Sequence, residues 1–244
     1  LIGPQAATDV TDSSARLNAA VNPSGFDTSC VFELVDDATF QTSGFDDADT
    51  LPCVPANLGA GFDLVPVSAD ATGLASSTLY HFRVVATNAE GTTNGNDTTF
   101  RTAGVPIVIA ESASEISDTS ARLDATIVPS GFPTSCFFEY VDDATFQSSG
   151  FDDAATAPCT PDPIGDGFGE ATANATITGL EPGTTYHFRV VAENQVGTAT
   201  GDGDTFETRL SFLDLVDTFG GSGFAGGQFS SPLGIAVDHR GGRF

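Results

Sequence analysis

Hydrophobic and polar residues alternate with a period of two in the clearest segments of the first half of the chain. These segments are Ser14–Val21 (SARLNAAV), Cys30–Val35 (CVFELV) and Tyr80–Thr87 (YHFRVVAT). Because successive side chains of a strand point to opposite faces, each segment is predicted to be a strand with one buried face. No segment has a sustained helical period, and Gly, Pro, Asn and Asp separate the runs at the spacing of turns. The pattern predicts an all-β fold in which short antiparallel strands pack as a sandwich.

The same pattern occurs twice along the chain. ARLNAAVNPSGFDTSC returns as ARLDATIVPSGFPTSC, and VDDATFQTSGFDDADTLPC returns as VDDATFQSSGFDDAATAPC, each about 106 residues later. A repeat of about 100 residues is an ordinary length for one domain. We therefore predict two sibling domains, residues 1–103 and 104–208, followed by a tail of residues 209–244. The linker TAGVPIV (Thr102–Val108) contains a proline and no flexible Gly/Ser run, which predicts a semi-rigid rod.

A leucine precedes a tyrosine by six residues in both repeats, as Leu74 and Tyr80 and as Leu180 and Tyr186. In Greek-key sandwiches a tyrosine so placed, the tyrosine corner, bonds back to nearby backbone. Together with the segments TLYHFRVVATN and TTYHFRVVAEN, this arrangement resembles the bacterial variety of the fibronectin type III family. The resemblance implies two antiparallel Greek-key β-sandwiches in tandem.

The expected core differs from that family in one respect. Fibronectin type III domains usually carry a tryptophan on strand B, where this chain has Leu17 and Leu123. The chain has no tryptophan and 20 phenylalanines. We expect phenylalanine to fill the core in place of tryptophan.

Each copy of the YHFRVV segment carries a histidine and an arginine two residues apart. If the tyrosine points inward, the alternation places these polar residues on the outer face. Strand C pairs with strand F in this fold, so we expect exposed cross-strand pairs Glu33–Arg83 and Glu139–Arg189. We favour this structural role over catalysis, and expect the following residues to be exposed: His81, Arg83, His187 and Arg189.

The four cysteines have the same spacing in both repeats, Cys30 with Cys53 and Cys136 with Cys159. Four cysteines allow three pairings, and duplication favours one disulfide within each domain because both units must fold alike. Two cysteines without a nearby histidine make a poor zinc site, the competing interpretation. Disulfides indicate an oxidising, extracellular or cell-surface setting.

Acidic, aromatic and glycosylation motifs are the remaining candidates for a site. Calcium binding at the acidic loops is an alternative to a merely solvated surface, which we favour because the spacing of an EF-hand is missing. The candidate calcium ligands are Asp46, Asp47, Asp152 and Asp153. Loop phenylalanines either plug the ends of the sandwich or contact a partner or a sugar, and they are Phe26, Phe40, Phe45, Phe132, Phe146 and Phe151. Sequons occur at Asn96 and Asn174.

The tail differs from the rest of the chain. The segment GQFSSPLGIAVD (Gly227–Asp238) resembles the opening of an NHL repeat, a unit of β-propellers. One repeat cannot close a propeller, so we expect either a partial propeller or an extended segment that adds to a neighbouring subunit. The candidate assembly residues are Phe219, Phe229, Ile235 and Val237.

The composition excludes some classes of function. The formal net charge is −25, from 33 acidic and 8 basic residues, all of them arginine. Such a surface repels phosphate backbones, so nucleic-acid binding is excluded, and no apolar run is long enough for membrane insertion. No catalytic set of residues stands out, so we expect neither an enzyme nor a cofactor. The prediction is an extracellular structural protein, as a surface stalk, adhesin spacer or filament subunit, that associates with itself or with other surface proteins. An accessory module for carbohydrate or protein ligands is the alternative.

Overall fold

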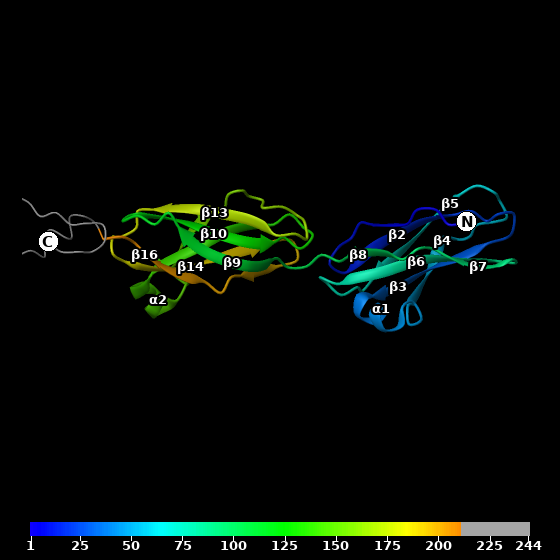
Figure 1. Cartoon of the computed structure of the whole chain (residues 1–244), viewed down its shortest axis with the longest axis horizontal. Coiled ribbons are helices and arrows are strands. Elements are labelled where there is room, and N and C mark those ends of the chain that lie inside the picture. The colour runs from blue at the N-terminus through cyan, green and yellow to red at the C-terminus, as the bar shows by residue number, and fades with distance from the viewer. Residues whose placement is uncertain (211–244) are drawn as a thin grey trace, which may run out of the picture.

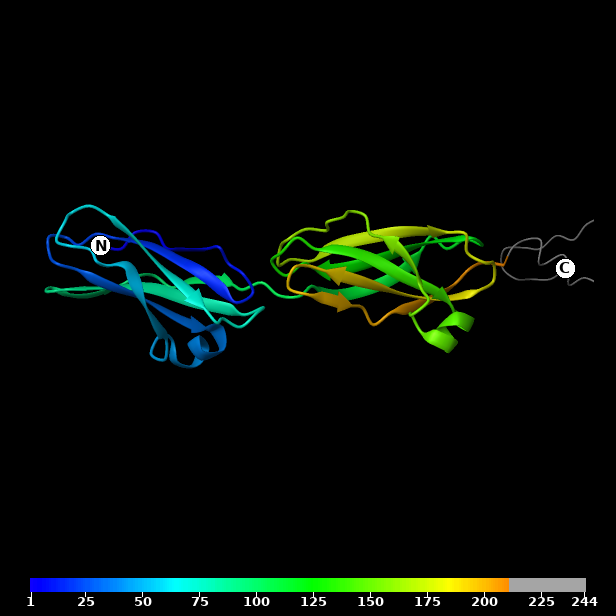
Figure 2. The same cartoon turned by 180° about the vertical axis from the view of Figure 1, so that it is seen from behind.

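The protein is all-β, with two sandwiches that follow each other along the chain. The structure, a computed structural model, describes residues 1–210. In Figure 1 the two sandwiches lie end to end, with the N-terminus at the far end of the first sandwich. Figure 2 shows from behind that a single linker joins them. Among the described residues, no helix is long and apolar enough to cross a membrane.

The first sandwich contains strands β1 to β8. They are β1 (Ala6–Thr8), β2 (Ser14–Val21), β3 (Ser29–Asp36), β4 (Asp49–Asn57), β5 (Val65–Thr72), β6 (Leu79–Asn88), β7 (Gly91–Asn94) and β8 (Thr98–Arg101). The sheet order is β1-β2-β5-β4-β3-β6-β7, with β8 also paired to β6. Strand β4 joins the two layers because it pairs with β3 along most of its length and with β5 through Val54 and Ser68.

The second sandwich repeats this arrangement with β9 to β16. They are β9 (Ile107–Ser114), β10 (Ser120–Val128), β11 (Ser135–Asp142), β12 (Ala155–Pro158), β13 (Ala171–Thr178), β14 (Thr185–Glu193), β15 (Thr198–Thr200) and β16 (Asp204–Glu207). Its sheets are separate, with orders β13-β10-β9 and β12-β11-β14-β15, and β16 also pairs with β14. The strands predicted from alternation are therefore present in both repeats.

Phenylalanine fills the core, as the composition predicts. Phe32 and Phe82 in the first sandwich and Phe138 and Phe188 in the second are fully buried. Their rings lie 6.3 Å apart in the first pair and 6.5 Å apart in the second, within the range of favourable aromatic pairs. Leu17 and Leu123, the expected replacements for a core tryptophan, are also fully buried. The two cores share no residue, so each sandwich has a hydrophobic core of its own.

Both predicted tyrosine corners are formed. The hydroxyl of Tyr80 accepts a hydrogen bond from the backbone N–H of Ala75 at 2.9 Å, and that of Tyr186 accepts one from Glu181 at 3.0 Å. Each tyrosine ring also stacks on a phenylalanine of the last strand of its sandwich, with ring centroids 5.6 Å apart. The corner therefore ties the start of strands β6 and β14 to the connection that precedes them.

The predicted disulfides join Cys30 to Cys53 and Cys136 to Cys159, and no described cysteine is free. Each bridge connects the start of one strand, β3 or β11, to a cysteine in or just after β4 or β12. All four cysteines are buried. The bridges therefore hold the segment after the helix of each sandwich against its sheet.

Two short helices lie between the strands, although no segment of the sequence has a sustained helical period. Helices α1 (Asp37–Ser43) and α2 (Asp143–Ser149) occupy the segments read as acidic loops. Asp36 caps α1 by accepting a hydrogen bond from the N–H of Thr39, and Gly44 ends it with φ at 60°. Seven residues are too few for a helical period to show in the sequence. The predicted tail, with Phe219, Phe229, Ile235 and Val237, lies outside the described residues.

Replacement of both Cys30 and Cys53 by alanine should lower the free energy of unfolding of the first sandwich by roughly 3 kcal/mol. The bond closes a loop across a sequence separation of 23 residues, and the open loop raises the entropy of the unfolded chain. Urea unfolding followed by circular dichroism measures this loss, with the intact Cys136–Cys159 bond in the second sandwich as the internal control. Peptide mapping without reductant that found Cys30 joined to Cys136 or Cys159 would contradict the pairing.

Candidate functional site

His81 lies between two carboxylates on the outer face of β6. Its Nε2 is 3.0 Å from Oδ1 of Asp37, in α1, and its Nδ1 is 2.9 Å from Oδ2 of Asp97. The imidazole also stacks on the ring of Phe40, with centroids 3.8 Å apart and planes 7° apart. The residue is only 7 % exposed, so the expectation of an exposed His81 is wrong. The alternation assigned the correct face of the strand, but α1 covers that face.

The charge state of His81 follows from these neighbours. Burial lowers the pKa of the imidazole, but hydrogen bonds and charges from Asp97 and Asp37 outweigh it, so the pKa of His81 lies above its ordinary value of 6.5. Donation to both carboxylates requires both ring nitrogens to carry protons, which is the charged form. The pKa of Asp37 is lowered, first by the hydrogen bond from Gln41 and then by that from His81.

Arg83 forms the cross-strand pair that the sequence predicts. Its Nε donates to Oε2 of Glu33 at 2.6 Å, and the two residues are direct partners in the β3–β6 register. The guanidinium carbon lies 4.2 Å from the ring centroid of Phe45, which packs edge-on against Phe40. Arg83 is thus half-buried rather than exposed, because an aromatic ring covers it.

The second sandwich repeats this cluster with one change. His187 stacks on Phe146 and contacts Asp143 at 2.8 Å, while Arg189 pairs with Glu139 at 2.6 Å. The position equivalent to Asp97 is Gly203, and His187 forms one salt bridge where His81 forms two. The pKa of Asp143 is lowered, chiefly by its hydrogen bond with His187. Both His187 and Arg189 are half-buried.

The two clusters fasten the short helices to the sheets. Salt bridges and cation–π contacts hold α1 and α2 against β6 and β14, and such contacts each contribute on the order of 1 kcal/mol. His81 contacts two carboxylates and a phenylalanine ring, whereas His187 contacts one carboxylate and a phenylalanine ring. Among residues 1–210, no buried side-chain nitrogen or oxygen lacks a hydrogen-bond partner.

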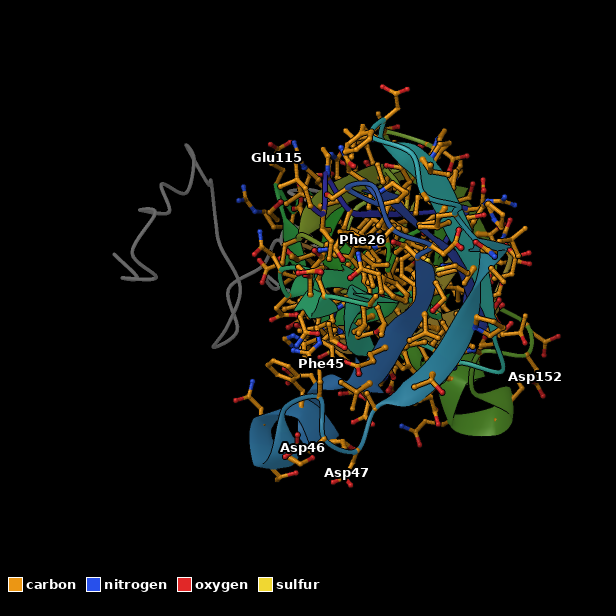
Figure 3. All side chains as sticks on the ribbon, turned by 90° about the vertical axis from the view of Figure 1, so that its right-hand side faces the viewer. Phe26, Phe45, Asp46, Asp47, Glu115 and Asp152 are labelled. Atoms are coloured by element: carbon orange, nitrogen blue, oxygen red, sulfur yellow. A yellow bond between two sulfur atoms is a disulfide. The ribbon has the colours of Figure 1, made fainter. Side chains whose placement is uncertain are left out.

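The acidic and glycosylation candidates stand apart from these clusters. Figure 3 shows the labelled aspartates of both helical segments pointing away from the sandwiches, and all four candidate calcium ligands are exposed: Asp46, Asp47, Asp152 and Asp153. The part of the chain that is described holds no group of three or more His, Cys, Asp or Glu side chains that could hold a metal ion. Asn96 is exposed in the loop before β8, whereas Asn174 lies within β13 and donates its side-chain amide to the carbonyl of Thr160 at 3.2 Å.

The loop phenylalanines do not all plug the ends of the sandwiches. Phe40 and Phe45 cover the outer face of a sheet, as do Phe146 and Phe151 in the second sandwich. Only Phe26 keeps the character of an exposed aromatic at an end, with 41 % of its surface exposed.

The joint between the sandwiches is the second candidate site. The linker runs from Thr102 to Pro106, between β8 and β9, and all of it except Val105 is buried. It is shorter than the predicted linker because β9 already begins at Ile107.

The first half of the linker is bonded to the first sandwich. The hydroxyl of Thr102 donates to the carbonyl of Ala75 at 2.6 Å and accepts from the N–H of Thr78 at 2.9 Å. The N–H of Ala103 donates to the carbonyl of Thr11 at 3.0 Å. These bonds fix the direction in which the linker leaves the first sandwich.

The second half of the linker is bonded to the second sandwich. The N–H of Gly104 donates to the carbonyl of Ser130 at 2.9 Å, and the carbonyl of Gly104 accepts from Nδ2 of Asn194 at 2.8 Å. A Cβ on Gly104 would lie 1.8 Å from Oγ of Ser77, and one on Gly131 would lie 3.0 Å from Cβ of Ala103. A side chain at Gly104 would therefore collide with Ser77 of the first sandwich, and one at Gly131 would crowd Ala103 of the linker.

Asn194 is the central polar group of this joint. It is 8 % exposed, and its Nδ2 also donates to the carbonyl of Pro129 at 3.0 Å. Its Oδ1 accepts from the N–H groups of Val196 and Gly197. The amide thus uses both donors and both lone pairs of its oxygen, which is how a buried polar side chain avoids a desolvation penalty. Hydrophobic alternation does not point to Asn194, although an asparagine stands at the same place in both repeats (Asn88 and Asn194).

Comparison with solved structures finds proteins whose folds overlap with that of this chain only in part. No protein-family model matches the chain, and no curated protein matches it. The chicken CNTN1 FN1–FN3 domains are 15 % identical with a TM-score of 0.38, covering 86 % of this chain and 66 % of that chain. A two-domain fibronectin type III segment of chicken tenascin is 17 % identical with a TM-score of 0.33, covering 85 % of this chain and 99 % of that one.

A third neighbour covers less of the chain. It is the sensor domain of the anti-sigma factor RsgI4 of Pseudobacteroides cellulosolvens, which is 25 % identical with a TM-score of 0.32. The match covers 43 % of this chain and 92 % of that chain. Overlaps at these TM-scores are too partial to transfer a function from any of the three proteins.

Raising the pH from about 6 to about 8 should destabilise the first sandwich through His81. A pKa raised in the folded state contributes stability that is fully present below the unfolded pKa, 6.5, and is lost as the pH rises through the folded pKa. Urea unfolding midpoints at the two pH values measure the loss.

The matched control is Asp97→Asn, which keeps the shape of the side chain and removes one of the two charges that raise the pKa of His81. This variant should lose part of the pH dependence while the general effect of charge repulsion at high pH remains. An unchanged pH dependence in Asp97→Asn would show that the pair does not stabilise the fold.

Proposed function

We propose that this chain is a non-enzymatic extracellular structural protein, a stalk or spacer built from tandem fibronectin type III-like sandwiches. The observation that carries the proposal is the buried linker, which is hydrogen-bonded to the first sandwich through Thr102 and Ala103 and to the second through Gly104. A linker without such bonds would let the sandwiches reorient, because interfaces between domains of one chain are usually small and mobile. A spacer needs the opposite property, a fixed distance between its ends.

An extracellular setting is supported by the disulfides and by the surface charge. Each sandwich has one disulfide, and such bonds persist in oxidising compartments. The net charge of −25 keeps such a rod soluble and repels nucleic acids and anionic lipid. The His81 and His187 clusters fit the same role because they fasten the helices to the sheets instead of forming a reactive cleft.

An accessory binding module remains the second candidate. One observation favours it: Phe26 and Phe62 are 41 % and 76 % exposed, at the end of the first sandwich that lies away from the linker. Exposed aromatic residues that lie together often mark a surface for a partner or a sugar. Self-association through the tail, and calcium binding at the acidic segments, stay predictions.

Asn194→Ala should loosen the joint. The variant leaves the carbonyls of Gly104 and Pro129 without their donor, which should lower the free energy of unfolding of the second sandwich by about 1–3 kcal/mol. Small-angle X-ray scattering should show a broader distribution of overall lengths than in the wild type.

Asn88→Ala is the matched control, because Asn88 occupies the equivalent place in the first sandwich and has no bond to the linker. This variant should leave the distribution of lengths unchanged. If the wild type already scatters as two sandwiches in variable orientations, the chain is not a rigid spacer and the proposal fails.

A further inference from the structure

The end of the first sandwich that lies away from the linker carries the same residues that hold the linker in the second sandwich. We call the group in the second sandwich the occupied socket; it consists of Pro129, Ser130, Gly131, Phe168 and Asn194. The equivalent group in the first sandwich, 106 residues earlier, is the open socket; it consists of Pro23, Ser24, Gly25, Phe62 and Asn88. All five residue types are identical between the two sockets.

The backbone of the open socket already has the conformation of the occupied one. Ser24 and Ser130 have φ values of 58° and 63°, and Gly25 and Gly131 have values of 90° and 97°. A Cβ on Gly25 would lie 2.8 Å from Cζ of Phe62, as one on Gly131 would lie 2.7 Å from Cζ of Phe168. A left-handed serine is uncommon, so its occurrence at both positions indicates a shape that the repeat specifies, whether or not a linker is present.

The exposure of matched residues shows what the linker covers. Ser130 is 4 % exposed, whereas Ser24 is exposed at the surface; Phe168 is 48 % exposed and Phe62 76 %. A hollow at this end is lined by Ser24, Phe26 and Asn88, among others. Figure 3 looks onto this end of the molecule and shows Phe26 near its middle.

The side-chain N–H groups of Asn88 are only loosely satisfied in the open socket. Nδ2 of Asn88 reaches the carbonyl of Pro23 at 3.3 Å and Oγ1 of Thr28 at 3.4 Å, both long for hydrogen bonds. In the occupied socket the corresponding Nδ2 of Asn194 bonds at 2.8 Å and 3.0 Å, the shorter bond being to the linker. An incoming carbonyl would give Asn88 the partner that Asn194 has.

We infer that the open socket is a docking site for the linker end of another sandwich of this kind, with a sequence such as Ala103–Pro106. This inference rests on the proposed function, since it extends the rigid rod by one unit. Leu1 is the equivalent of Ile107. If another sandwich were joined ahead of Leu1 through such a linker, that linker would enter the open socket in the register that Ala103–Pro106 has in the occupied socket. The linker glycine would donate to the carbonyl of Ser24 and accept from Asn88.

The end of the second sandwich of another copy is a poorer occupant. Thr208 repeats the bonds of Thr102, but the residues that follow it are Arg209 and Leu210 in place of Ala103 and Gly104. In the occupied socket Cβ of Ala103 already lies close to where Gly131 would carry a side chain, and Gly104 has no room for one. Large side chains at both positions would therefore keep the linker out.

The test is a chain in which a copy of residues 1–106 is joined directly ahead of Leu1 of the full chain. The added copy can fold because the core of the first sandwich contains no residue of the second. Isotope labelling of the added copy lets NMR follow hydrogen exchange at its Gly104 amide. This amide should exchange at least about tenfold more slowly than in an unprotected peptide, as an amide in a stable hydrogen bond does.

Two substitutions in the extended chain decide the outcome. Asn88→Ala in the sandwich that follows the added copy should restore fast exchange at the Gly104 amide of that copy. Asn194→Ala should do the same for the native Gly104 and serves as the reference.

If the added Gly104 amide exchanges freely while the native one is protected, the inference is wrong, and the aromatic end of the first sandwich serves some other ligand. If Asn194→Ala leaves even the native amide protected, the joint does not depend on this asparagine. The role that the inference gives to Asn88 would then be wrong as well, while the proposed function, which rests on the buried linker, would stand. A native Gly104 amide that exchanges freely in the unsubstituted chain would instead overturn the proposed function.

Discussion

The amide of Asn194 is the interaction on which the arrangement of the two sandwiches depends. It joins a loop of the second sandwich to the carbonyl of Gly104, in a linker whose preceding residues are bonded to the first sandwich. Because Asn194 is buried and every one of its hydrogen-bonding groups is used, loss of the linker would leave a donor without a partner. One side chain thereby couples the fold of the second sandwich to its orientation relative to the first.

The clusters on β6 and β14 stabilise the two short helices, and they use the same residue types in both repeats. A helix of seven residues with no buried side chain has little stability of its own. Stacking of Phe40 on His81 and of Phe45 under Arg83 holds α1 in place, and the disulfide fixes the strand that follows. The histidine and arginine that first suggested an active site are thus the polar layer between a sheet and a short helix.

The tyrosine corners and the pair Glu33–Arg83 follow from the resemblance to Greek-key sandwiches of the fibronectin type III kind, in which strand C pairs with strand F. Local alternation predicted the strands and the inward residues such as Leu17 and Phe82, because a strand's period is a local property. It failed where a contact comes from a distant loop. The burial of His81 depends on α1, which a cap at Asp36 starts, and on Asp97 from a loop after β7. The part played by Asn194 depends on a linker 90 residues away in the sequence. The repetition of Asn88 and Asn194 was the only sequence signal for it.

The central claim is that the buried linker holds the two sandwiches as one rigid body. Residual dipolar couplings test it most directly, since they report the orientation of each backbone N–H relative to a common frame. If the joint is rigid, couplings from residues 1–101 and from residues 107–208 will fit a single alignment tensor with the orientation of the structure. Two tensors of clearly different magnitude would mean that the sandwiches reorient independently, and the account of the joint would be wrong.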